Sequence, residues 1–268
     1  MNTNHQLTKN PDKSFVIELT LKKEEIKKEY DHVLSHFQAE FEQNGFRKGK
    51  APLDVVEKNV SPQAVIEEVL NHLLPESYQK IIEENQLKPI VEPSIKIKNE
   101  KLSMDSDWEL SIESAELPDI IISPKLYEEV KNINADKKIE DKDKLNKIVE
   151  NIDKNVTLNL PQVILTHDTN RRLSELISQL QNANLTLDQY LKNKNIDISQ
   201  LRKDTETQIK KDWTLNLAIN QIAIDNKINV EKEDTEKLFE KNPELKQDPN
   251  LVIFLLTQQK VLEHLKKL

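Results

Sequence analysis

The stretch "QNGFRKGKAP" (residues 43–52) contains the only two glycines, Gly45 and Gly49, in a chain of 268 residues. Glycine adopts positive φ without a steric penalty, so a chain that otherwise avoids it places it where the backbone must turn sharply. Pro52 then fixes the exit of the turn. We therefore expect a tight loop with an exposed tip. The side chains at this tip are those of Phe46, Arg47, Lys48 and Lys50.

The sequence on both sides of this loop predicts strands and helices in one domain. Residues 14–21 alternate between apolar and polar, as in a half-buried strand, and residues 87–98 and 107–117 are also typical of strands. From Lys23 to Phe41, apolar residues recur at the spacing of an amphipathic helix. The order strand, helices, strands predicts an α+β domain.

A second amphipathic helix is predicted after Ser61, and it contains Pro75. Proline has no backbone N–H, and its ring clashes with the preceding turn of a helix. We therefore expect Pro75 to break or kink this helix.

The second half of the chain is predicted to be helical. We place the α+β domain at residues 1–130 and an elongated all-α domain at residues 131–268. Residues 131–144 are highly charged, which fits either a linker at the boundary or the exposed first turns of a long helix. Both alternatives stay open at this point.

The composition favours an extended, helix-rich body with a thin core, because only 36% of the residues are hydrophobic and 32% are charged. The net charge of −8 argues against general nucleic-acid binding, so an anionic partner would have to meet a local basic patch. The absence of cysteine excludes disulfides and thiolate chemistry. No apolar run is long enough to cross a bilayer and the N-terminus has no apolar signal segment, so we expect a cytoplasmic protein without membrane partners.

The search for catalytic chemistry predicts no active site. Phosphate-binding loops, dinucleotide fingerprints and nucleophile elbows all require glycines, and both glycines are already assigned to the loop. His32 and His36 have the i,i+4 spacing of a metal-binding pair, but no third ligand is apparent nearby in the sequence. We therefore expect no catalytic residues, no metal and no cofactor.

An aromatic side chain beside three cations suits either RNA phosphates or an acidic protein surface. The alternative is an ordinary connection between two helices, in which Phe46 tucks under its own domain. The residues of the loop leave both alternatives open.

Together with the elements around it, this loop resembles the ribosome-binding domain of bacterial trigger factor. The signature of that family is Gly-Phe-Arg-x-Gly-x-x-Pro, and the sequence "GFRKGKAP" matches it, followed by an apolar helix, "LPESYQKIIEENQLKPIVEPSI" and a β-ribbon. The resemblance implies docking beside the nascent-chain exit on the large ribosomal subunit, with contacts to ribosomal protein and rRNA. The implied ribosome-binding residues are Gly45, Phe46, Arg47, Lys48, Gly49, Lys50 and Pro52.

The second half is similar, by pattern, to the C-terminal domain of the same family. The stretches "NVTLNLPQVILTHDTNRRLSELISQL" and "DISQLRKDTETQIKKDWTLNLAINQIAIDNKINVEKED" look like its long arm helices. The resemblance implies a cradle that shields unfolded or nascent polypeptides through exposed apolar side chains. The candidates for client contact, where they are exposed, are Leu176, Trp213, Leu217, Phe254 and Leu255.

The chain departs from the family in one respect. The usual member carries an FKBP-like prolyl isomerase domain, rich in glycine, between the two halves, and here the intervening segment contains no glycine. The resemblance therefore implies an ATP-independent, ribosome-associated chaperone that is not an enzyme. The alternatives are an RNA-binding module that uses the basic loop and a free holdase that acts away from the ribosome. The oligomeric state is open, with a weak homodimer among the alternatives.

Overall fold

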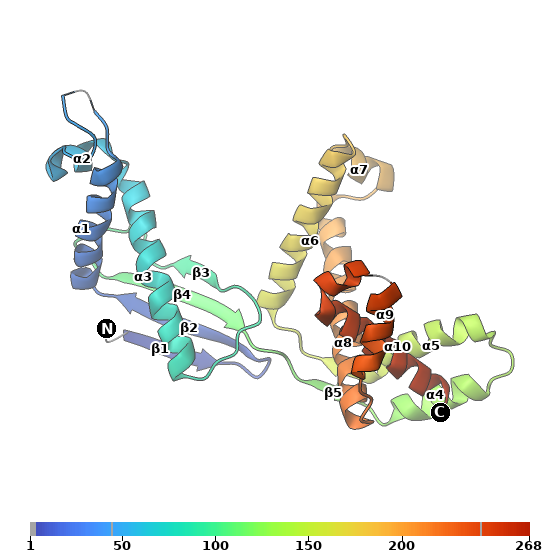
Figure 1. The fold of residues 1–268 in the computed structure, drawn as a ribbon. Helices are drawn as coiled ribbons and strands as arrows, with labels where there is room; N and C mark the ends of the chain where they lie inside the picture. Colours follow the sequence, from blue (N-terminus) through green and yellow to red (C-terminus); the bar gives the residue numbers. More distant parts are fainter. Residues whose placement is uncertain (1–3, 44, 242) are drawn as a thin grey trace. The chain divides into compact units, whose positions relative to one another are not determined.

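The computed structural model describes residues 4–43, 45–241 and 243–268 (Figure 1). The chain divides into two compact units, Met1–Leu117 and Pro118–Leu268. The first is α+β and the second is mainly helical, so the predicted fold class is confirmed.

The first unit is built on a four-stranded antiparallel sheet with the strand order β1-β2-β4-β3. Three helices, α1, α2 and α3, lie in the chain between β2 and β3. The elements of this unit are β1 (Asn4–Lys9), β2 (Ser14–Leu21), α1 (Lys23–Glu40), α2 (Leu53–Asn59), α3 (Pro62–Glu84), β3 (Ser94–Ile97) and β4 (Trp108–Ala115).

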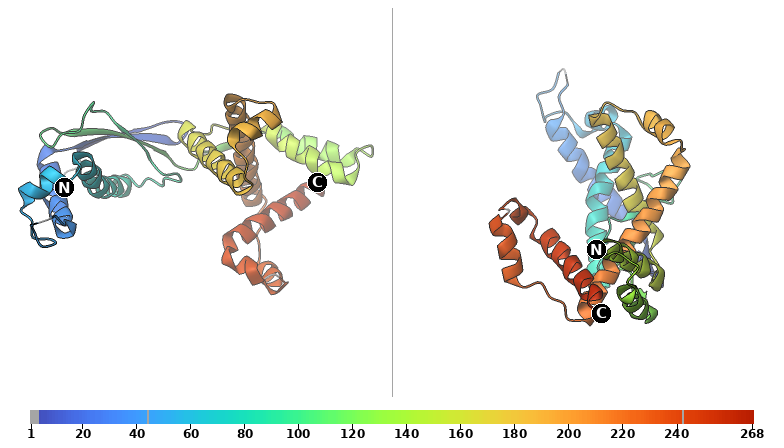
Figure 2. Two further views of the ribbon diagram at one scale, coloured as in Figure 1. Left: turned by 90° about the horizontal axis from the view of Figure 1, so that it is seen from above. Right: turned by 90° about the vertical axis from the view of Figure 1, so that its right-hand side faces the viewer.

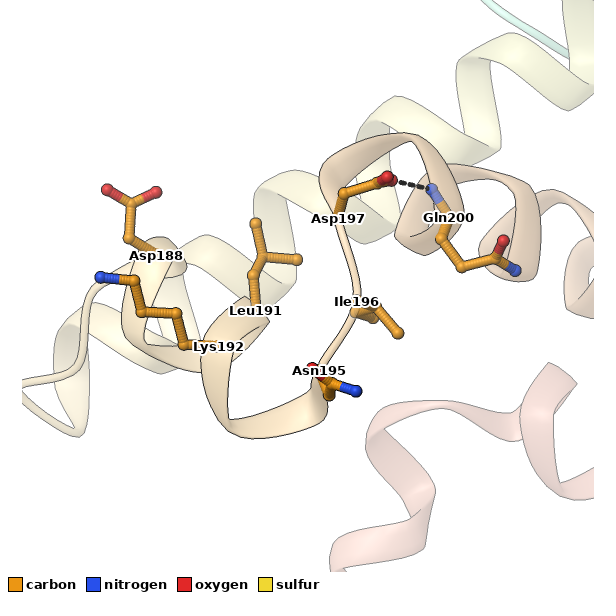
Figure 3. A pocket seen from close by; sticks show the side chains of 7 residues that line it. All are labelled: Asp188, Leu191, Lys192, Asn195, Ile196, Asp197 and Gln200. Carbon is orange, nitrogen blue, oxygen red and sulfur yellow. Dashed lines mark hydrogen bonds between the residues drawn. The ribbon is translucent and has the colours of Figure 1, made fainter.

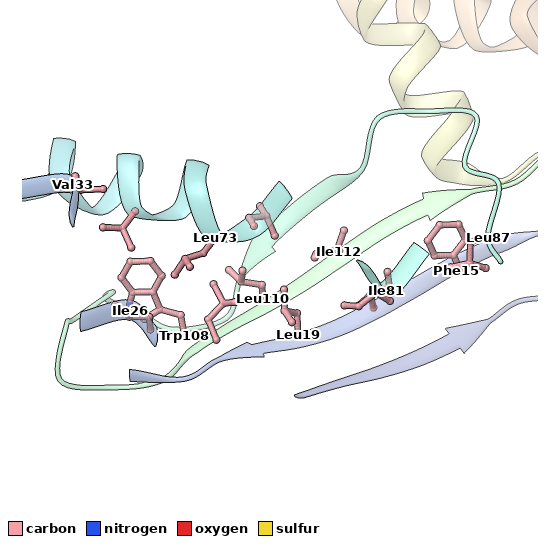
Figure 4. Close-up of a cluster of buried hydrophobic side chains, with 14 of the residues drawn as sticks. Phe15, Leu19, Ile26, Val33, Leu73, Ile81, Leu87, Trp108, Leu110 and Ile112 are labelled. Atoms are coloured by element: carbon pink, nitrogen blue, oxygen red, sulfur yellow. The ribbon is translucent and has the colours of Figure 1, made fainter. Parts of the chain in front are cut away.

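The core of the first unit lies between one face of this sheet and the helices α1 and α3 (Figure 4). The strands β2 and β4 pair with Ile17 opposite Ile112 and Leu19 opposite Leu110, and all four side chains are buried. The predicted alternation therefore sets the register, because a shift by one residue would turn these side chains to the other face. Trp108, at the start of β4, is fully buried as well.

Helix α3 continues through Pro75, so of the two expected effects of this proline, a break or a kink, the break is wrong. Both Pro75 and Asn71, the residue one turn before it, are exposed. Water can therefore satisfy the Asn71 carbonyl, which loses its partner because proline has no N–H. The apolar stripe continues on both sides of Pro75, and its packing holds the helix together.

The second unit is a bundle of helices with one short, two-stranded antiparallel sheet, β5-β6. The sequence analysis did not foresee this sheet. The elements of this unit are β5 (Ile120–Ile122), α4 (Lys125–Ala135), α5 (Asp141–Asn155), β6 (Val156–Leu158), α6 (Gln162–Asn182), α7 (Leu187–Lys194), α8 (Ile198–Asp225), α9 (Lys232–Lys241), the 3-10 helix η1 (Pro243–Gln247) and α10 (Pro249–Lys266).

The boundary between the units lies at Leu117–Pro118 rather than at the expected position after residue 130. The physical reason is that Leu126 and Val130 are fully buried in the core of the second unit, so α4 belongs to that unit. The charged residues 131–144 form neither a tether nor one long helix. They contain the end of α4, a turn and the first residues of α5.

The core of the second unit gathers α4 and α5 around the C-terminal parts of α8 and α10. Helices α6 and α8 lie side by side, and the short helix α7 connects their far ends. Helices α9 and α10 extend from the same core in a different direction (Figure 2). Among the described residues, none of the helices combines the length and the apolar character that a bilayer crossing requires.

Candidate functional site

The glycine loop follows α1 and is closed by backbone hydrogen bonds. Phe46 N–H donates to the Gln43 carbonyl at 3.0 Å, and Gly49 N–H donates to the Phe41 carbonyl at 3.2 Å. Lys50 N–H donates to the Arg47 carbonyl at 2.9 Å, which closes a second turn. These hydrogen bonds give the described part of the loop, residues 45–52, a defined backbone shape, although little of it is buried.

Both glycines have positive φ, as the sequence predicts: +98° at Gly45 and +72° at Gly49. At Gly45 the value lies beyond the left-handed region that other residues occupy at some cost. At Gly49 a Cβ atom would also lie 3.2 Å from the carbonyl oxygen of Ala39 in α1. Glycine is thus required at Gly45 by the backbone conformation and at Gly49 by both conformation and space.

A small apolar platform supports the base of the loop. Leu34, Ala51 and Val56 are buried there, and they join α1 to the start of α2. The side-chain amide of Gln38 donates to the Ala51 carbonyl at 2.7 Å and ties the exit of the loop to α1.

Tyr30 packs against the same platform and connects it to α2 through its hydroxyl, which donates to Glu57 at 2.8 Å. Burial, followed by this hydrogen bond, raises the pKa of Tyr30 to about 12. The phenol therefore stays protonated at neutral pH and keeps its hydrogen bond.

The tip of the loop presents one aromatic ring and three cations to solvent. Phe46 is 40% exposed, so the alternative in which it tucks under its own domain is wrong. Arg47, Lys48 and Lys50 are all exposed. Lys48 Nζ lies 3.7 Å from Glu40, and this pair is too exposed to hold the side chain firmly.

Neither Arg47 nor Lys50 forms an ion pair with any residue that the structure describes, so both charges are available to a partner. Sequence reasoning did not select Leu53, which is 42% exposed directly after Pro52 and extends the apolar surface at the start of α2. Its apolar type beside the loop is the signal that could have identified it.

Of the five candidates for client contact, only Leu255 is exposed, at 50%. The other four are half-buried: Leu176, Trp213, Leu217 and Phe254. The indole N–H of Trp213 donates to the Asp168 carboxylate at 2.8 Å and thereby ties α8 to α6.

Exposed apolar side chains also occur on the first half of α10, with Ile253 on nearly the opposite side of the helix from Leu251 and Leu255. Leu251 and Ile253 are exposed there together with Leu255. The sequence "LVIFLL" (residues 251–256) is apolar on every side of the helix, so one face cannot bury all of it. We call Leu251, Ile253 and Leu255 the α10 surface.

A shallow, open depression of about 560 Å³ lies at the turn between α7 and α8 (Figure 3). Polar side chains such as Asp188, Lys192 and Gln200 line it. The Asp197 carboxylate accepts a hydrogen bond from Gln200 N–H at 2.7 Å and caps α8. This chemistry accounts for the start of a helix rather than for a ligand site.

His32 and His36 stack edge to face on α1, with ring centroids 4.5 Å apart. A third histidine, His72 of α3, lies beside them, together with Glu29. The hydrogen bond to Glu29 raises the pKa of His72, and the hydrogen bonds from His32 and His72 lower the pKa of Glu29. The expectation that no third ligand is close to the histidine pair is therefore wrong in three dimensions.

Comparison with known proteins identifies the family. The sequence model described as "Bacterial trigger factor protein (TF)" matches residues 3–156, and the model described as "Bacterial trigger factor protein (TF) C-terminus" matches residues 125–268. A trigger factor of Streptococcus mutans is 27% identical over 133 residues, which are 47% of this chain and 31% of that protein. A trigger factor of Lactococcus lactis is 31% identical over 114 residues, which are 42% of this chain and 26% of that protein.

These alignments cover less than a third of either relative. The fold is also similar to a solved structure from work on promiscuous substrate recognition in the folding and assembly activities of the trigger factor chaperone. That likeness has a TM-score of 0.64 at 13% identity, and it covers 98% of this chain and 99% of the other. Since the first sequence model alone spans more than half of the sequence, this chain belongs to the bacterial trigger factor family of chaperones.

Proposed function

We propose that this protein is an ATP-independent, cytoplasmic chaperone that docks on the large ribosomal subunit near the nascent-chain exit and shields apolar segments of unfolded or newly made polypeptides. In this proposal it has no prolyl isomerase activity. The observation that supports docking most strongly is the exposed Phe46 among three exposed cations, on a loop whose backbone is held in shape before binding. A preformed loop loses little conformational entropy when it binds.

The chemistry of the tip fits a surface of rRNA and protein. Arg47, Lys48 and Lys50 offer charge to phosphates, and Phe46 offers an apolar contact. The residues that shape the loop are Gly45, Gly49 and Pro52. The net charge of −8 limits this attraction to the basic loop, so binding is expected to be reversible and sensitive to salt.

The second part of the proposal concerns clients. The α10 surface exposes leucine and isoleucine side chains without a fixed pocket around them, which suits weak contacts with many apolar sequences. Tethering to the ribosome then raises the effective concentration of this surface near an emerging chain. Leu255 is the one predicted client residue that the proposal keeps as a direct contact.

Docking is tested by cosedimentation with ribosomes over a range of salt concentrations. The variant Phe46→Ala/Arg47→Ala/Lys48→Ala should lose cosedimentation while keeping the helical circular dichroism spectrum. For the wild type, three phosphate contacts predict a slope of about −2 to −3 for log K against log salt. Unchanged cosedimentation of the variant would reject the docking role of the loop.

A matched control variant distinguishes a specific effect of the loop from a general effect of lost positive charge. Ile97→Ala/Lys96→Ala/Lys101→Ala removes one exposed apolar side chain and two exposed cations from another part of the same unit. It should bind ribosomes like the wild type. Equal binding of the wild type to ribosomes and to free structured RNA would favour the RNA-binding alternative.

Client shielding is tested by the aggregation of a chemically denatured reporter enzyme after dilution into buffer. Leu251→Ser/Ile253→Ser/Leu255→Ser should lose most of the protection without losing ribosome binding. The control Ile121→Ser/Ile198→Ser/Ile224→Ser removes side chains that are at least as exposed, elsewhere in the same unit. Equal loss of protection in both variants would argue against a client site on α10.

A further inference from the structure

Five side chains form a cluster between α1 and α3 that plays no part in the proposed docking or shielding. We call it the histidine cluster, and it comprises Glu29, His32, His36, Glu68 and His72. Its members come from two helices that are joined through the glycine loop and α2. The cluster lies at the surface, with the side chain of His32 57% exposed and that of His72 34% exposed.

Three members of the cluster converge on one point. Glu29 Oε1 lies 3.0 Å from His32 Nδ1 and 2.8 Å from His72 Nδ1. One ligand atom from each of these three residues lies within 4.8 Å of the other two. In a tetrahedral zinc site with bonds of 2.0–2.1 Å, neighbouring ligand atoms are about 3.3 Å apart. The two distances from Glu29 Oε1 to the histidine nitrogens are therefore only a few tenths of an ångström shorter than that separation.

The second nitrogen of each of these two imidazoles already has a partner. His32 Nε2 lies 3.2 Å from His36 Nε2, and His72 Nε2 lies 3.4 Å from a Glu68 carboxylate oxygen. A histidine that binds a metal through one nitrogen usually donates its other N–H to such an acceptor, which fixes the orientation of the ring. The cluster thus orients both rings with Nδ1 toward Glu29. An incoming metal ion would displace the proton that each Nδ1 shares with Glu29, and Nε2–H would then donate to His36 or Glu68.

We propose that Glu29, His32 and His72 bind a divalent transition-metal ion of the Zn²⁺ type and thereby cross-link α1 to α3. Two imidazole nitrogens and one carboxylate oxygen are ligands that Zn²⁺ accepts, and solvent can supply the fourth ligand at this exposed position. His36 and Glu68 are positioning residues that orient the two imidazoles.

The location of the site gives the metal a structural consequence. Helix α1 leads directly into the glycine loop, and α3 belongs to the core of the first unit. An ion held between the two helices fastens the helix that carries the loop to the body of the unit.

The test measures metal binding directly and does not depend on ribosome binding. Protein without an affinity tag is titrated with Co²⁺, whose visible absorption reports nitrogen ligands and coordination number, and with Zn²⁺ by calorimetry. The wild type should bind one ion and gain thermal stability, because an ion that binds only the folded state raises the melting temperature. Absence of binding at a Zn²⁺ concentration of about 100 μM would overturn the proposal.

Two ligand variants and a matched control locate the ion. His72→Gln and His32→Gln should each lose binding and the thermal shift. His264→Gln, in the other compact unit, should behave like the wild type. Equal binding by all three variants would contradict the proposed ligands.

A further variant distinguishes the proposed site from a simple i,i+4 pair on α1. His36→Gln should weaken binding by about 10- to 100-fold without abolishing it, as expected for a residue that orients a ligand. If His36→Gln abolishes binding while His72→Gln keeps it, the ion is held by His32 and His36 on one helix, and the cross-link between α1 and α3 does not exist.

Discussion

The two units of this chain bury and expose their apolar side chains in different ways. Each contains one of the two tryptophans of the sequence. In the first unit, Trp108 is fully buried, and its indole N–H donates to the Ser103 carbonyl at 2.8 Å. In the second, Trp213 is half-buried and is held by one hydrogen bond to Asp168 between two helices.

The surfaces proposed to bind partners also differ between the two units, one being rigid and the other adaptable. The loop of the first unit owes its shape to backbone geometry at two glycines, and it suits one fixed partner. The α10 surface of the second unit consists of aliphatic side chains without a defined pocket, and it suits many partners. A rigid binding site such as the loop is therefore identified from its backbone geometry. An adaptable binding surface such as that of α10 is identified from the exposure of its apolar side chains.

The largest expected effect tests the contrast between the tryptophans. Trp108→Ala should destabilise the first unit by about 3–5 kcal/mol, because it removes a fully buried indole from a packed core. Trp213→Ala should cost about 1–2 kcal/mol, since it removes a half-buried ring and one hydrogen bond. Denaturant unfolding followed by circular dichroism measures both values.

Fluorescence adds an internal control to this comparison. In Trp108→Ala the remaining tryptophan reports the second unit, whose unfolding transition should stay where it is in the wild type. Equal losses of stability in the two variants would contradict the contrast between the cores.

A substitution with an intermediate expected effect tests whether the backbone conformation at Gly49 keeps the loop rigid. Gly49→Ala should destabilise the observed loop by about 1–2 kcal/mol, because alanine at positive φ is strained and its Cβ would crowd the Ala39 carbonyl. The proposed ribosome affinity should fall by about tenfold, with every cation still in place.

The control for this variant is Ala39→Gly, which leaves the φ angle of residue 49 unchanged. It should not reproduce the loss of affinity. Wild-type affinity in Gly49→Ala would mean that the loop adopts another shape when it binds.

The smallest effect concerns acid stability in the first unit. Asp107 binds Lys22 Nζ at 2.8 Å and accepts a hydrogen bond from the first backbone N–H of α1, that of Lys23, at 2.9 Å. The hydrogen bond from Lys22, followed by that from the backbone, lowers the pKa of Asp107. A carboxyl group with a lowered pKa stabilises the fold above its ordinary value of about 3.9, and this contribution is lost as the pH falls through the lowered pKa.

Asp107→Asn should therefore be less stable than the wild type at neutral pH, and the difference should shrink below pH ~4. Thermal unfolding at a series of pH values measures it. The second unit supplies the reference, because its transition should not respond to this substitution. A difference that stays constant with pH would show that the charge of Asp107 contributes nothing.

Sequence reasoning succeeded where the pattern is local. The alternation in residues 14–21 identified β2, and the glycines identified a loop with positive φ at both positions. It missed β1, because this edge strand is mostly exposed and carries no apolar alternation. Of the break or kink expected at Pro75, the break does not occur, because packing of the whole stripe outweighs the local cost of proline.

The rest depended on contacts between distant residues. His72 lies 40 positions from His32, and only the packing of α3 on α1 brings the two together. The exposure of apolar residues on α10 could not be predicted either, since a helix that is apolar all round looks like a core helix. The roles of the loop and of the α10 surface in binding stay predictions until they are measured.

The division at Leu117–Pro118 has a consequence for how such a chain can be assembled and altered. The sheet and the helices of the first unit are complete before residue 118, and the next core is made entirely of later residues. During synthesis, the amino-terminal module can finish folding while the rest is still unmade. Over evolutionary time, a whole domain can be inserted or deleted at this boundary without exposing the hydrophobic core of either unit.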